Sequence, residues 1–429
     1  MIPLALLALA LATPPAPPSA APAAAAAPAP EELFQQALEA QKAGDGPRYR
    51  DLLERTVAGL PDASRLYYRL AGARLLAGDR AGALAALRLQ VDAGIDRDPR
   101  PDPAFAPLLE DPAFRAEVER MLRLREPLAR ASEAFRLERG DLIEGIAHDE
   151  KTGAIFLSSV RERRIVRRER DGTLSELVAA GAHGLAAALG LAVDAPGRRL
   201  WVVSAGLPHA AGHDPAERER SALLAFDLDR GTLLRRVAAP AGALWNDLEL
   251  APDGTVSASD PARQAIDRVA PDGAVTPLVA GQGLRSPGGL ALSADGARLY
   301  VADWTKGLAV VDLASGRLEW MKAPPGATTL GIDGLRRRGD ALVAIQNGVQ
   351  PARIQRFTLA GNGRALAGAE MLERARPDWD EPTLGTLVGG ELWYVANSHW
   401  PKFDENGALA AGSSLEPTLV LRLPLAAAR

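Results

Sequence analysis

The sequence predicts a mainly β protein, a six-bladed β-propeller preceded by a small all-α helical-repeat segment. Three observations lead to this prediction. A short pattern of alternating apolar and polar residues, broken by a turn, is written six times in residues 135–429. Its period of roughly 42 to 57 residues is typical of propeller blades. Residues 31–130 instead carry apolar residues at helical spacing.

Residues 1–30 differ in composition from the rest of the chain. The stretch from Ile2 to Ala12 is an apolar run with the length of a signal-peptide core, too short to span a bilayer. An Ala/Pro-rich stretch follows as far as Pro30. We predict a secretory signal peptide and a flexible linker, and therefore a periplasmic or secreted protein without a transmembrane span. The alternative is a disordered cytosolic tail, because residues 1–30 contain no Lys or Arg.

The charge balance and the absence of cysteine exclude several classes of function. The chain of 429 residues has 54 acidic and 50 basic residues. A general nucleic-acid-binding protein would need a basic stripe, so we expect no nucleic-acid partner. No cysteine is present, which rules out disulfides and thiolate metal sites.

The segment 31–130 resembles the tetratricopeptide class of helical repeats. Apolar residues from Leu70 to Leu76 form one helical face, Gly78-Asp79 breaks it, and Ala83 to Leu89 forms the next. The resemblance covers about one and a half repeats, whereas about three are usual for stability. We therefore expect the segment to pack on something else. It is either an N-terminal cap on the propeller or a groove for a protein partner.

The six copies share one position at the start of their first strand. Each copy alternates in polarity, turns at Asp-Gly or an equivalent and alternates again, which is typical of a β-hairpin. Four short strands per copy favour a propeller, since a closed ring exposes only short sheet edges. The residues at the shared position are Gly145, Gly190, Asp247, Gly289, Gly334 and Gly385.

The ring predicts a shared polar site at one mouth of its central channel. Because the first two strands of each blade run antiparallel, the start of one and the end of the next lie at the same edge. The opening residues, blade by blade, are Glu144, Leu189, Asn246, Gly288, Asp333 and Leu384. A position that elsewhere takes Leu or Gly does not need Glu144, Asn246 or Asp333 for folding. Their oxygen atoms suit a hard cation such as Ca²⁺ and leave positions open for water and substrate.

Several other polar residues are candidates for binding a substrate. Asp247 stands where five copies keep Gly, so it is a direct or outer ligand. The second-strand ends contribute Gln346, Asn347 and Asn397. His399 is either an acid/base group or a packed residue beside Trp400.

Glu381 precedes the sixth copy, where it either points inward or is a loop charge. Together with Asp333 it is our candidate for the residue that activates water.

The motifs together resemble the regucalcin/gluconolactonase family. The resemblance covers about 137–423 and rests on the order and spacing of short motifs: Glu144-Gly145, Asn246-Asp247, Pro287 to Ala291, Tyr300 to Asp303, and Asp333 to Leu335. This family is similar in overall plan to paraoxonases and strictosidine synthases. The resemblance implies a six-bladed propeller with a divalent cation, Ca²⁺ or Zn²⁺, at the channel mouth, and hydrolysis of lactones or related esters.

By the same resemblance, Glu144, Asn246 and Asp333 match metal-site positions. The chain has Gly288 where the family usually has Asn, so one ligand of the family pattern is missing.

Two functions from different classes follow. The first is a metal-dependent hydrolase of a small-molecule lactone or ester. The alternative is a non-catalytic ligand- or protein-binding propeller of the cell envelope, with the helical segment as a second contact surface. The absence of the blade-four amide favours the alternative, while the three polar opening residues favour the hydrolase.

Overall fold

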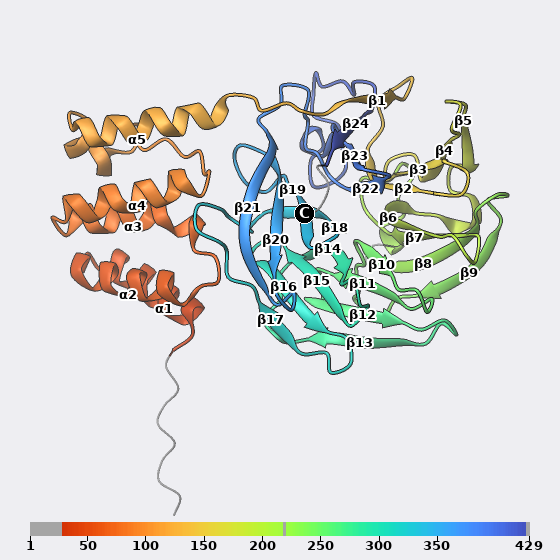
Figure 1. Cartoon of the computed structure of the whole chain (residues 1–429), viewed down its shortest axis with the longest axis horizontal. Coiled ribbons are helices and arrows are strands. Elements are labelled where there is room, and N and C mark those ends of the chain that lie inside the picture. The colour runs from red at the N-terminus through yellow and green to blue at the C-terminus, as the bar shows by residue number, and fades with distance from the viewer. Residues whose placement is uncertain (1–27, 218–219, 426–429) are drawn as a thin grey trace, which may run out of the picture.

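A computed structural model describes residues 28–217 and 220–425 of the chain (Figure 1). The signal peptide predicted near the N-terminus lies outside the described residues. In the described ranges, no helix is both long enough and apolar enough to cross a membrane.

From residue 28 onward, five α-helices precede the β-structure and stack along one side of it (Figure 1). They are α1 (Pro30–Lys42), α2 (Gly46–Gly59), α3 (Tyr67–Leu76), α4 (Arg80–Asp92) and α5 (Pro112–Leu122). Two hairpins, α1–α2 and α3–α4, have the same turn. Gly44 and Gly78 take left-handed backbone conformations, with φ of 72° and 81°. The following Asp45 and Asp79 cap the next helix by accepting hydrogen bonds from backbone N–H groups.

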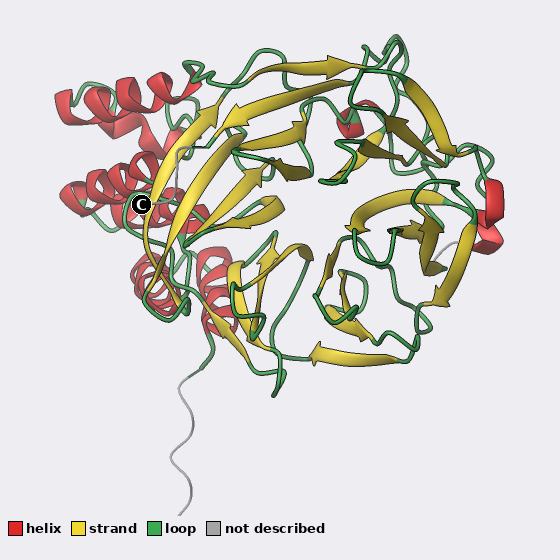
Figure 2. Cartoon of the chain, turned by 45° about the vertical axis from the view of Figure 1, so that its right-hand side comes forward, coloured by secondary structure: helices red, strands yellow, loops and turns green. Residues whose placement is uncertain are grey.

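Six four-stranded antiparallel sheets follow as the blades of a closed ring (Figure 2). The first three blades consist of β2 (Ile143–His148), β3 (Ile155–Ser159), β4 (Arg164–Arg168), β5 (Leu174–Val178); β6 (Ala187–Asp194), β7 (Arg199–Ala205), β8 (Ser221–Asp227), β9 (Leu233–Ala238); and β10 (Leu248–Leu250), β11 (Val256–Asp260), β12 (Ala265–Val269), β13 (Val275–Ala280).

The last three blades complete the ring. They consist of β14 (Pro287–Leu292), β15 (Arg298–Asp303), β16 (Gly307–Asp312), β17 (Leu318–Trp320); β18 (Ile332–Arg338), β19 (Ala341–Gln346), β20 (Arg353–Ala360), β21 (Ala365–Arg374); and β22 (Gly385–Val388), β23 (Glu391–Val395), β24 (Leu419–Pro424), β1 (Ser132–Arg136).

The first strands of neighbouring blades contact one another all the way around the ring, and β22 returns to β2. The sixth blade is composite, because its outermost strand β1 comes from the start of the β-region and pairs with β24. This pairing joins the start of the β-region to its last blade and so closes the ring. The prediction of a six-bladed propeller behind a helical segment is confirmed.

The shared glycine position is explained by how closely the innermost strands approach. A Cβ atom on Gly289 would lie 2.4 Å from the carbonyl oxygen of Asp333 in the next blade. On Gly145 it would lie 2.7 Å from the carbonyl oxygen of Leu189. Any side chain there would push the blades apart, so glycine at this position allows the ring to close tightly.

The helical segment packs directly on the propeller through buried polar contacts. The carboxylate of Asp62, in the α2–α3 connection, accepts hydrogen bonds from the Thr329 backbone N–H at 2.6 Å and the Thr328 hydroxyl at 2.8 Å. Arg353, which is 1% exposed, donates from β20 to the carbonyl oxygens of Ala93 and Gly94. These contacts join the helices to blades four and five.

Candidate functional site

β-Bulges set the direction of the channel-mouth carboxylates. The pairing of β2 with β3 shifts register between Ile143 and Ile146, so Glu144 lies in the irregular part. The pairing of β18 with β19 shifts between Ile332 and Gly334, which places Asp333 in the same situation. Bulges of this kind re-aim a side chain and are frequent beside active sites.

Glu144 is buried without a cationic partner in the described part of the chain. Its side chain accepts a 2.6 Å hydrogen bond from the Trp400 indole nitrogen to Oε2. Burial raises the pKa of Glu144 well above its usual value, and repulsion from Asp333, Glu381 and Asp247 raises it further, whereas the Trp400 hydrogen bond lowers it. These four carboxylates therefore share one electrostatic environment.

Asp333 is held by Asn347, which directly follows β19, the second strand of the same blade. Asn347 Nδ2 donates to Asp333 Oδ2 at 2.7 Å and to the Pro382 carbonyl at 3.2 Å, while its Oδ1 accepts from Trp304 Nε1 at 3.2 Å. Burial raises the pKa of Asp333 to about 6; the Asn347 hydrogen bond opposes this change, and Asp247 adds to it. Asn347 therefore orients Asp333 and favours its ionised form.

Glu381 lies in the loop before β22 and has a left-handed backbone conformation, with φ of 57°. This conformation is uncommon for a residue other than glycine and is found most often at functional sites. The Ser398 hydroxyl donates to its carbonyl oxygen at 2.8 Å. Burial raises the pKa of the Glu381 carboxyl to about 7, with further increases from Asp333 and Asp380.

Asn246 and Asp333 lie on either side of the position of Gly288. A Cβ atom on Gly288 would lie 3.8 Å from Asn246 Nδ2 and 3.8 Å from the Asp333 carbonyl oxygen. The space between these two residues can therefore take a side chain without a clash. Blade four therefore has an unfilled place beside Asn246. Metal binding by Glu144, Asn246 and Asp333 stays a prediction.

The donor set is small for a metal site. Within residues 28–217 and 220–425, no three Asp, Glu or His side chains are grouped so that they could hold a metal ion. A cation would have to use the two carboxylates of Glu144 and Asp333 with neutral oxygen donors such as the Asn246 amide. Burial and neighbouring carboxylates raise the pKa values of both carboxyls, and a bound cation would relieve this repulsion. Because a cation would offset this repulsion, the residues fit a cation.

Asp247 lies deeper in the wall between blades. It is fully buried, and in the described residues neither carboxylate oxygen accepts a hydrogen bond. The nearest cationic group is Arg336, whose Nη1 lies 3.8 Å from Oδ2. Burial raises the pKa of Asp247, and the Arg336 charge opposes that change. Its predicted role in binding substrate stays a prediction.

The other predicted substrate-binding side chains are engaged with the backbone. Gln346 Nε2 donates to the carbonyl oxygens of Thr328 and Leu330. Asn397 Oδ1 accepts from the Leu419 N–H at 2.6 Å. These bonds shape loops around the channel mouth.

His399 is fully buried and contacts oxygen atoms through both ring nitrogens. Nδ1 lies 2.8 Å from Asp380 Oδ2, and Nε2 lies 2.9 Å from the Glu416 carbonyl. The ring therefore fixes two loops to each other. Substrate binding by His399, Gln346 and Asn397 stays a prediction.

A pocket of about 410 Å³ adjoins Glu381. Asn347 and Glu381 form part of its wall, Arg376 and Trp379 form another part, and the helical segment contributes the ion pair of Asp96 with Arg125. The helical segment therefore borders the candidate site.

Sequence reasoning missed the tryptophans of this site. Trp304 directly follows the strand-ending Asp303, and Trp400 directly follows His399. For Trp304 the available signal was a tryptophan immediately after a strand end, whereas Trp400 lies five residues beyond the end of β23 and carried no such signal.

No protein-family model and no curated protein matches this chain. Solved structures do match it. They include a calcium-binding protein, regucalcin, from Agrobacterium tumefaciens, with 18% identity, coverage of 68% of this chain and 94% of that one, and a TM-score of 0.47. A gluconolactonase from Xanthomonas campestris has 19% identity, coverage of 70% and 94%, and a TM-score of 0.44. A virginiamycin B lyase from Staphylococcus aureus has 16% identity, coverage of 70% and 100%, and a TM-score of 0.46.

Proposed function

We propose that this protein is a metal-dependent hydrolase of a lactone or ester, with a divalent cation at the channel mouth. One observation supports the proposal most. Three carboxylates from different blades, Glu144, Asp333 and Glu381, lie in one environment where burial and mutual repulsion raise their pKa values. Perturbed carboxyl groups that gather at a channel mouth are typical of functional sites.

Glu144, Asp333 and the Asn246 amide would hold the cation, and their oxygen donors favour Ca²⁺, with Zn²⁺ as the second candidate. A bound cation supplies a Lewis acid that polarises the carbonyl group of the substrate. Trp400 and Asn347 hold the two carboxylates through single hydrogen bonds of 2.6 and 2.7 Å. The protein's contribution is therefore to fix these oxygens before substrate arrives.

Glu381 is the better candidate for the base that takes a proton from water. A general base works best when its pKa lies near the operating pH. The pKa of Glu381 is raised to about 7 and that of Asp333 to about 6. Glu381 also borders the pocket of about 410 Å³, within the 300–1,000 Å³ common for small-molecule sites. A small substrate in this pocket would have its carbonyl group near Glu381.

The alternative is a non-catalytic propeller that binds a ligand or a protein. The place left by Gly288 and the small number of carboxylate donors favour it. The helical segment would then be the contact surface for a protein partner. Its two Gly-Asp turns, about 34 residues apart, match the period of tetratricopeptide repeats, and we propose that it belongs to that class.

We also propose that the protein acts in the periplasm or outside the cell. The apolar run from Ile2 to Ala12 supports this location. N-terminal sequencing of protein purified from an envelope fraction would test it. Cleavage within residues 1–30 is expected, and an intact N-terminus in the cytosol would contradict it.

Metal analysis combined with hydrolysis assays tests the main proposal. The wild type is assayed on a panel of lactones and aryl esters with Ca²⁺, with Zn²⁺ and after chelation. We expect Glu144→Gln to lose both metal and turnover, because it removes a ligand. Glu381→Gln should retain metal and lose turnover. Glu32→Gln, on the exposed face of α1, is the matched control and should do neither.

A wild type without bound metal and without metal-dependent hydrolysis would overturn the hydrolase proposal. Turnover that survives Glu381→Gln would show that Glu381 is not the general base.

A further inference from the structure

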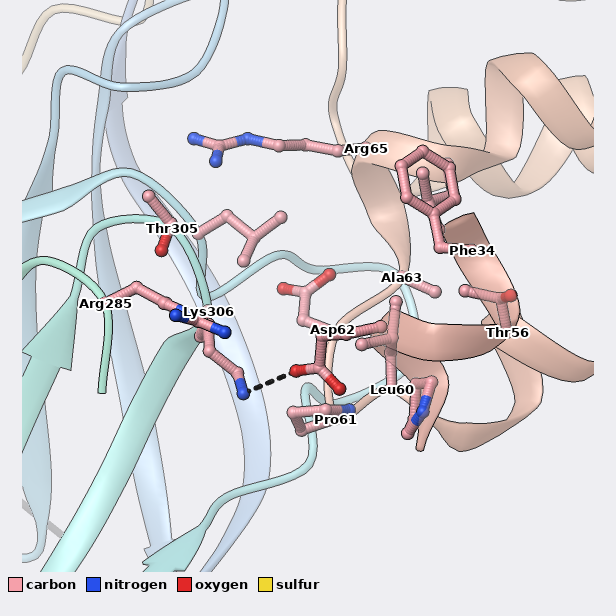
Figure 3. A pocket seen from close by; sticks show the side chains of 14 residues that line it. Phe34, Thr56, Leu60, Pro61, Asp62, Ala63, Arg65, Arg285, Thr305 and Lys306 are labelled. Atoms are coloured by element: carbon pink, nitrogen blue, oxygen red, sulfur yellow. Dashed lines mark hydrogen bonds and ion pairs between the residues drawn. The ribbon is translucent and has the colours of Figure 1, made fainter. Parts of the chain in front are cut away.

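A second pocket lies at the seam between the helical segment and blade four (Figure 3). It has a volume of about 250 Å³. Phe34, Thr56 and Leu60 of the helices face Thr305, Arg285 and Lys306 of the propeller across it, as Figure 3 shows. We call it the seam pocket. It shares no residue with the carboxylates at the channel mouth, so the inference below does not depend on the proposed hydrolase.

The walls of the seam pocket are mostly apolar. Phe34, Leu60 and Leu66 come from the helices, and Leu330 comes from the loop before β18. A concave apolar surface with a few charged groups at its rim is the usual form of a small-molecule site. The volume is below the usual lower bound of about 300 Å³ for drug-sized ligands, so the pocket suits a short chain or a single ring.

Positive charge is in excess around the seam pocket. Three cations border it, while the acidic residues are already engaged. Lys306 forms an ion pair with Glu31 at 2.8 Å, marked by the dashed line in Figure 3. The carboxylate of Asp62 receives the hydrogen bonds from Thr328 and Thr329 that dock the helices.

Arg65 and Arg285 remain without a carboxylate partner in the described part of the chain. Arg65 donates to two backbone carbonyls, of Trp304 at 3.4 Å and of Gly348 at 3.1 Å. Arg285 is exposed, and its guanidinium contacts Gln264 Oε1 at 3.5 Å. Burial lowers the pKa of Arg65, and the charges of Asp62 and Asp303 oppose this change only in part.

We propose that the seam pocket binds a small amphipathic anion, a carboxylate on a short alkyl or aryl chain. The chain would lie against Phe34 and Leu60, and the carboxylate would lie between the guanidinium groups of Arg65 and Arg285. Guanidinium groups are suited to planar carboxylates, because two N–H donors can meet two oxygens. The ligand would contact both the helices and the propeller, so it would stabilise their docking.

Charge also shows that a free anion fits the seam pocket better than the chain's own N-terminal segment does. Residues 1–27 precede Pro30, which lines the seam pocket, and they are apolar. They contain no Asp or Glu, so they offer nothing to the two guanidinium groups. A free anion satisfies both the apolar walls and the cationic rim.

The full-length protein is titrated calorimetrically with octanoate. Octan-1-ol and octylammonium keep the chain and change the charge, and acetate keeps the charge without the chain. We expect octanoate to bind at least about tenfold more tightly than each of the other three. Octan-1-ol and octylammonium lose the charge-assisted contact with the guanidinium groups, and acetate loses the burial of the apolar chain. Equal binding of octan-1-ol or octylammonium, or no binding of octanoate, would overturn the proposal.

Two matched pairs of variants test the position of the site. Arg285→Ala should weaken octanoate binding about tenfold, whereas Arg230→Ala, which removes an arginine that is 80% exposed on another blade, should leave it unchanged. Thr305→Glu places a negative charge on the exposed rim and should weaken binding, while the neutral Thr305→Gln should not. Octanoate binding that is equal in all four variants would place the ligand elsewhere and overturn the assignment.

Discussion

The indole nitrogen of Trp400 lies 2.6 Å from Oε2 of Glu144, although the two residues are 256 positions apart in the chain. Trp400 belongs to the long connection between β23 and β24, and Glu144 lies in the bulge of β2. The ring of His209 packs edge-on against Trp400, with centroids 4.8 Å apart. One side of the carboxylate cluster is therefore covered by a loop from the opposite end of the sequence.

Trp400→Phe should weaken cation binding at the channel mouth. The hydrogen bond from Trp400 lowers the pKa of Glu144, so its loss favours the protonated form and reduces the negative charge available to a cation. We expect the calcium dissociation constant to rise about fivefold to tenfold near neutral pH. Calorimetric titration measures it, with Trp393→Phe as the control, since that indole donates to Glu391 away from the candidate site. An unchanged constant would separate Trp400 from the site.

Asn347→Ala should move the acidic limb of the pH–activity profile to higher pH. Asn347 donates to Asp333 Oδ2, and this bond holds the pKa of Asp333 below the value that burial alone would give. Without it Asp333 is protonated up to a higher pH, so activity is lost earlier on acidification. We expect an upward shift of about one pH unit in the limb of kcat/KM, because charge-assisted hydrogen bonds contribute about 1.5 to 3 kcal/mol. A profile with the wild-type acidic limb would contradict this.

Gly288→Asn should strengthen cation binding. A Cβ atom at this position meets only ordinary contacts of 3.8 to 3.9 Å, and the new amide would lie between Asn246 and Asp333. We expect calcium to bind about tenfold more tightly, because each added oxygen ligand increases affinity.

The neighbouring Gly289→Asn is the contrast. Its Cβ would lie 2.4 Å from the Asp333 carbonyl oxygen, so we expect a loss of about 1–3 kcal/mol in the free energy of unfolding. Calcium titration and urea unfolding distinguish the two variants. Equal effects of both variants would show that the position of Gly288 has no room for a side chain.

Glu249→Gln should flatten the dependence of stability on pH. Glu249 borders a pocket of about 360 Å³ that the six first strands form along the channel. Burial raises its pKa to about 7, against the opposing charge of Arg336. The folded protein therefore binds this proton more tightly than the unfolded chain, whose Glu pKa is about 4.3.

The sign follows from this difference. Between about pH 4.5 and pH 7 the folded state holds more protons than the unfolded state, so stability falls as pH rises through that window. Between the two ends of this window, we expect the free energy of unfolding to decrease by up to about 3 kcal/mol less in Glu249→Gln than in the wild type. Urea unfolding at both pH values measures the difference. Glu32→Gln serves as the control. A fall as large as that of the wild type would show that Glu249 titrates normally.

Asp62→Ala should loosen the helical segment from the propeller. The change leaves the buried hydroxyl of Thr328 and the N–H and hydroxyl of Thr329 without their acceptor. We expect a loss of about 3 kcal/mol in the free energy of unfolding, together with faster proteolysis between the helices and β1. Asp51→Ala, whose exposed carboxylate pairs with Arg50 on α2, is the control and should cost less than about 1 kcal/mol. Equal costs would mean that Asp62 does not hold the two parts together.

The ring could be predicted from sequence because its period and turns are local signals. The glycines at Gly145, Gly190 and Gly289 were visible as a repeat, and the structure adds that each makes room for the next blade. The opening residues Glu144, Asn246 and Asp333 were found because a six-fold pattern shows which members depart from it.

The contacts that hold these residues were not predictable in the same way. Trp400 reaches Glu144 from a loop whose path depends on the fold of the whole sixth blade. Docking of the helices through Asp62 and Arg353 depends on pairs more than 250 positions apart. No periodicity reports such pairs, because each occurs once.

The composite sixth blade has a consequence for how the protein is made. β1 pairs with β24, whose residues are synthesised long after those of β1. Until then five blades form an open arc with two unsatisfied strand edges, which is the form most prone to pair with a neighbouring chain. A nascent chain that stops before Leu419 cannot complete the ring, so premature termination there would yield an aggregating product instead of a shortened but working one.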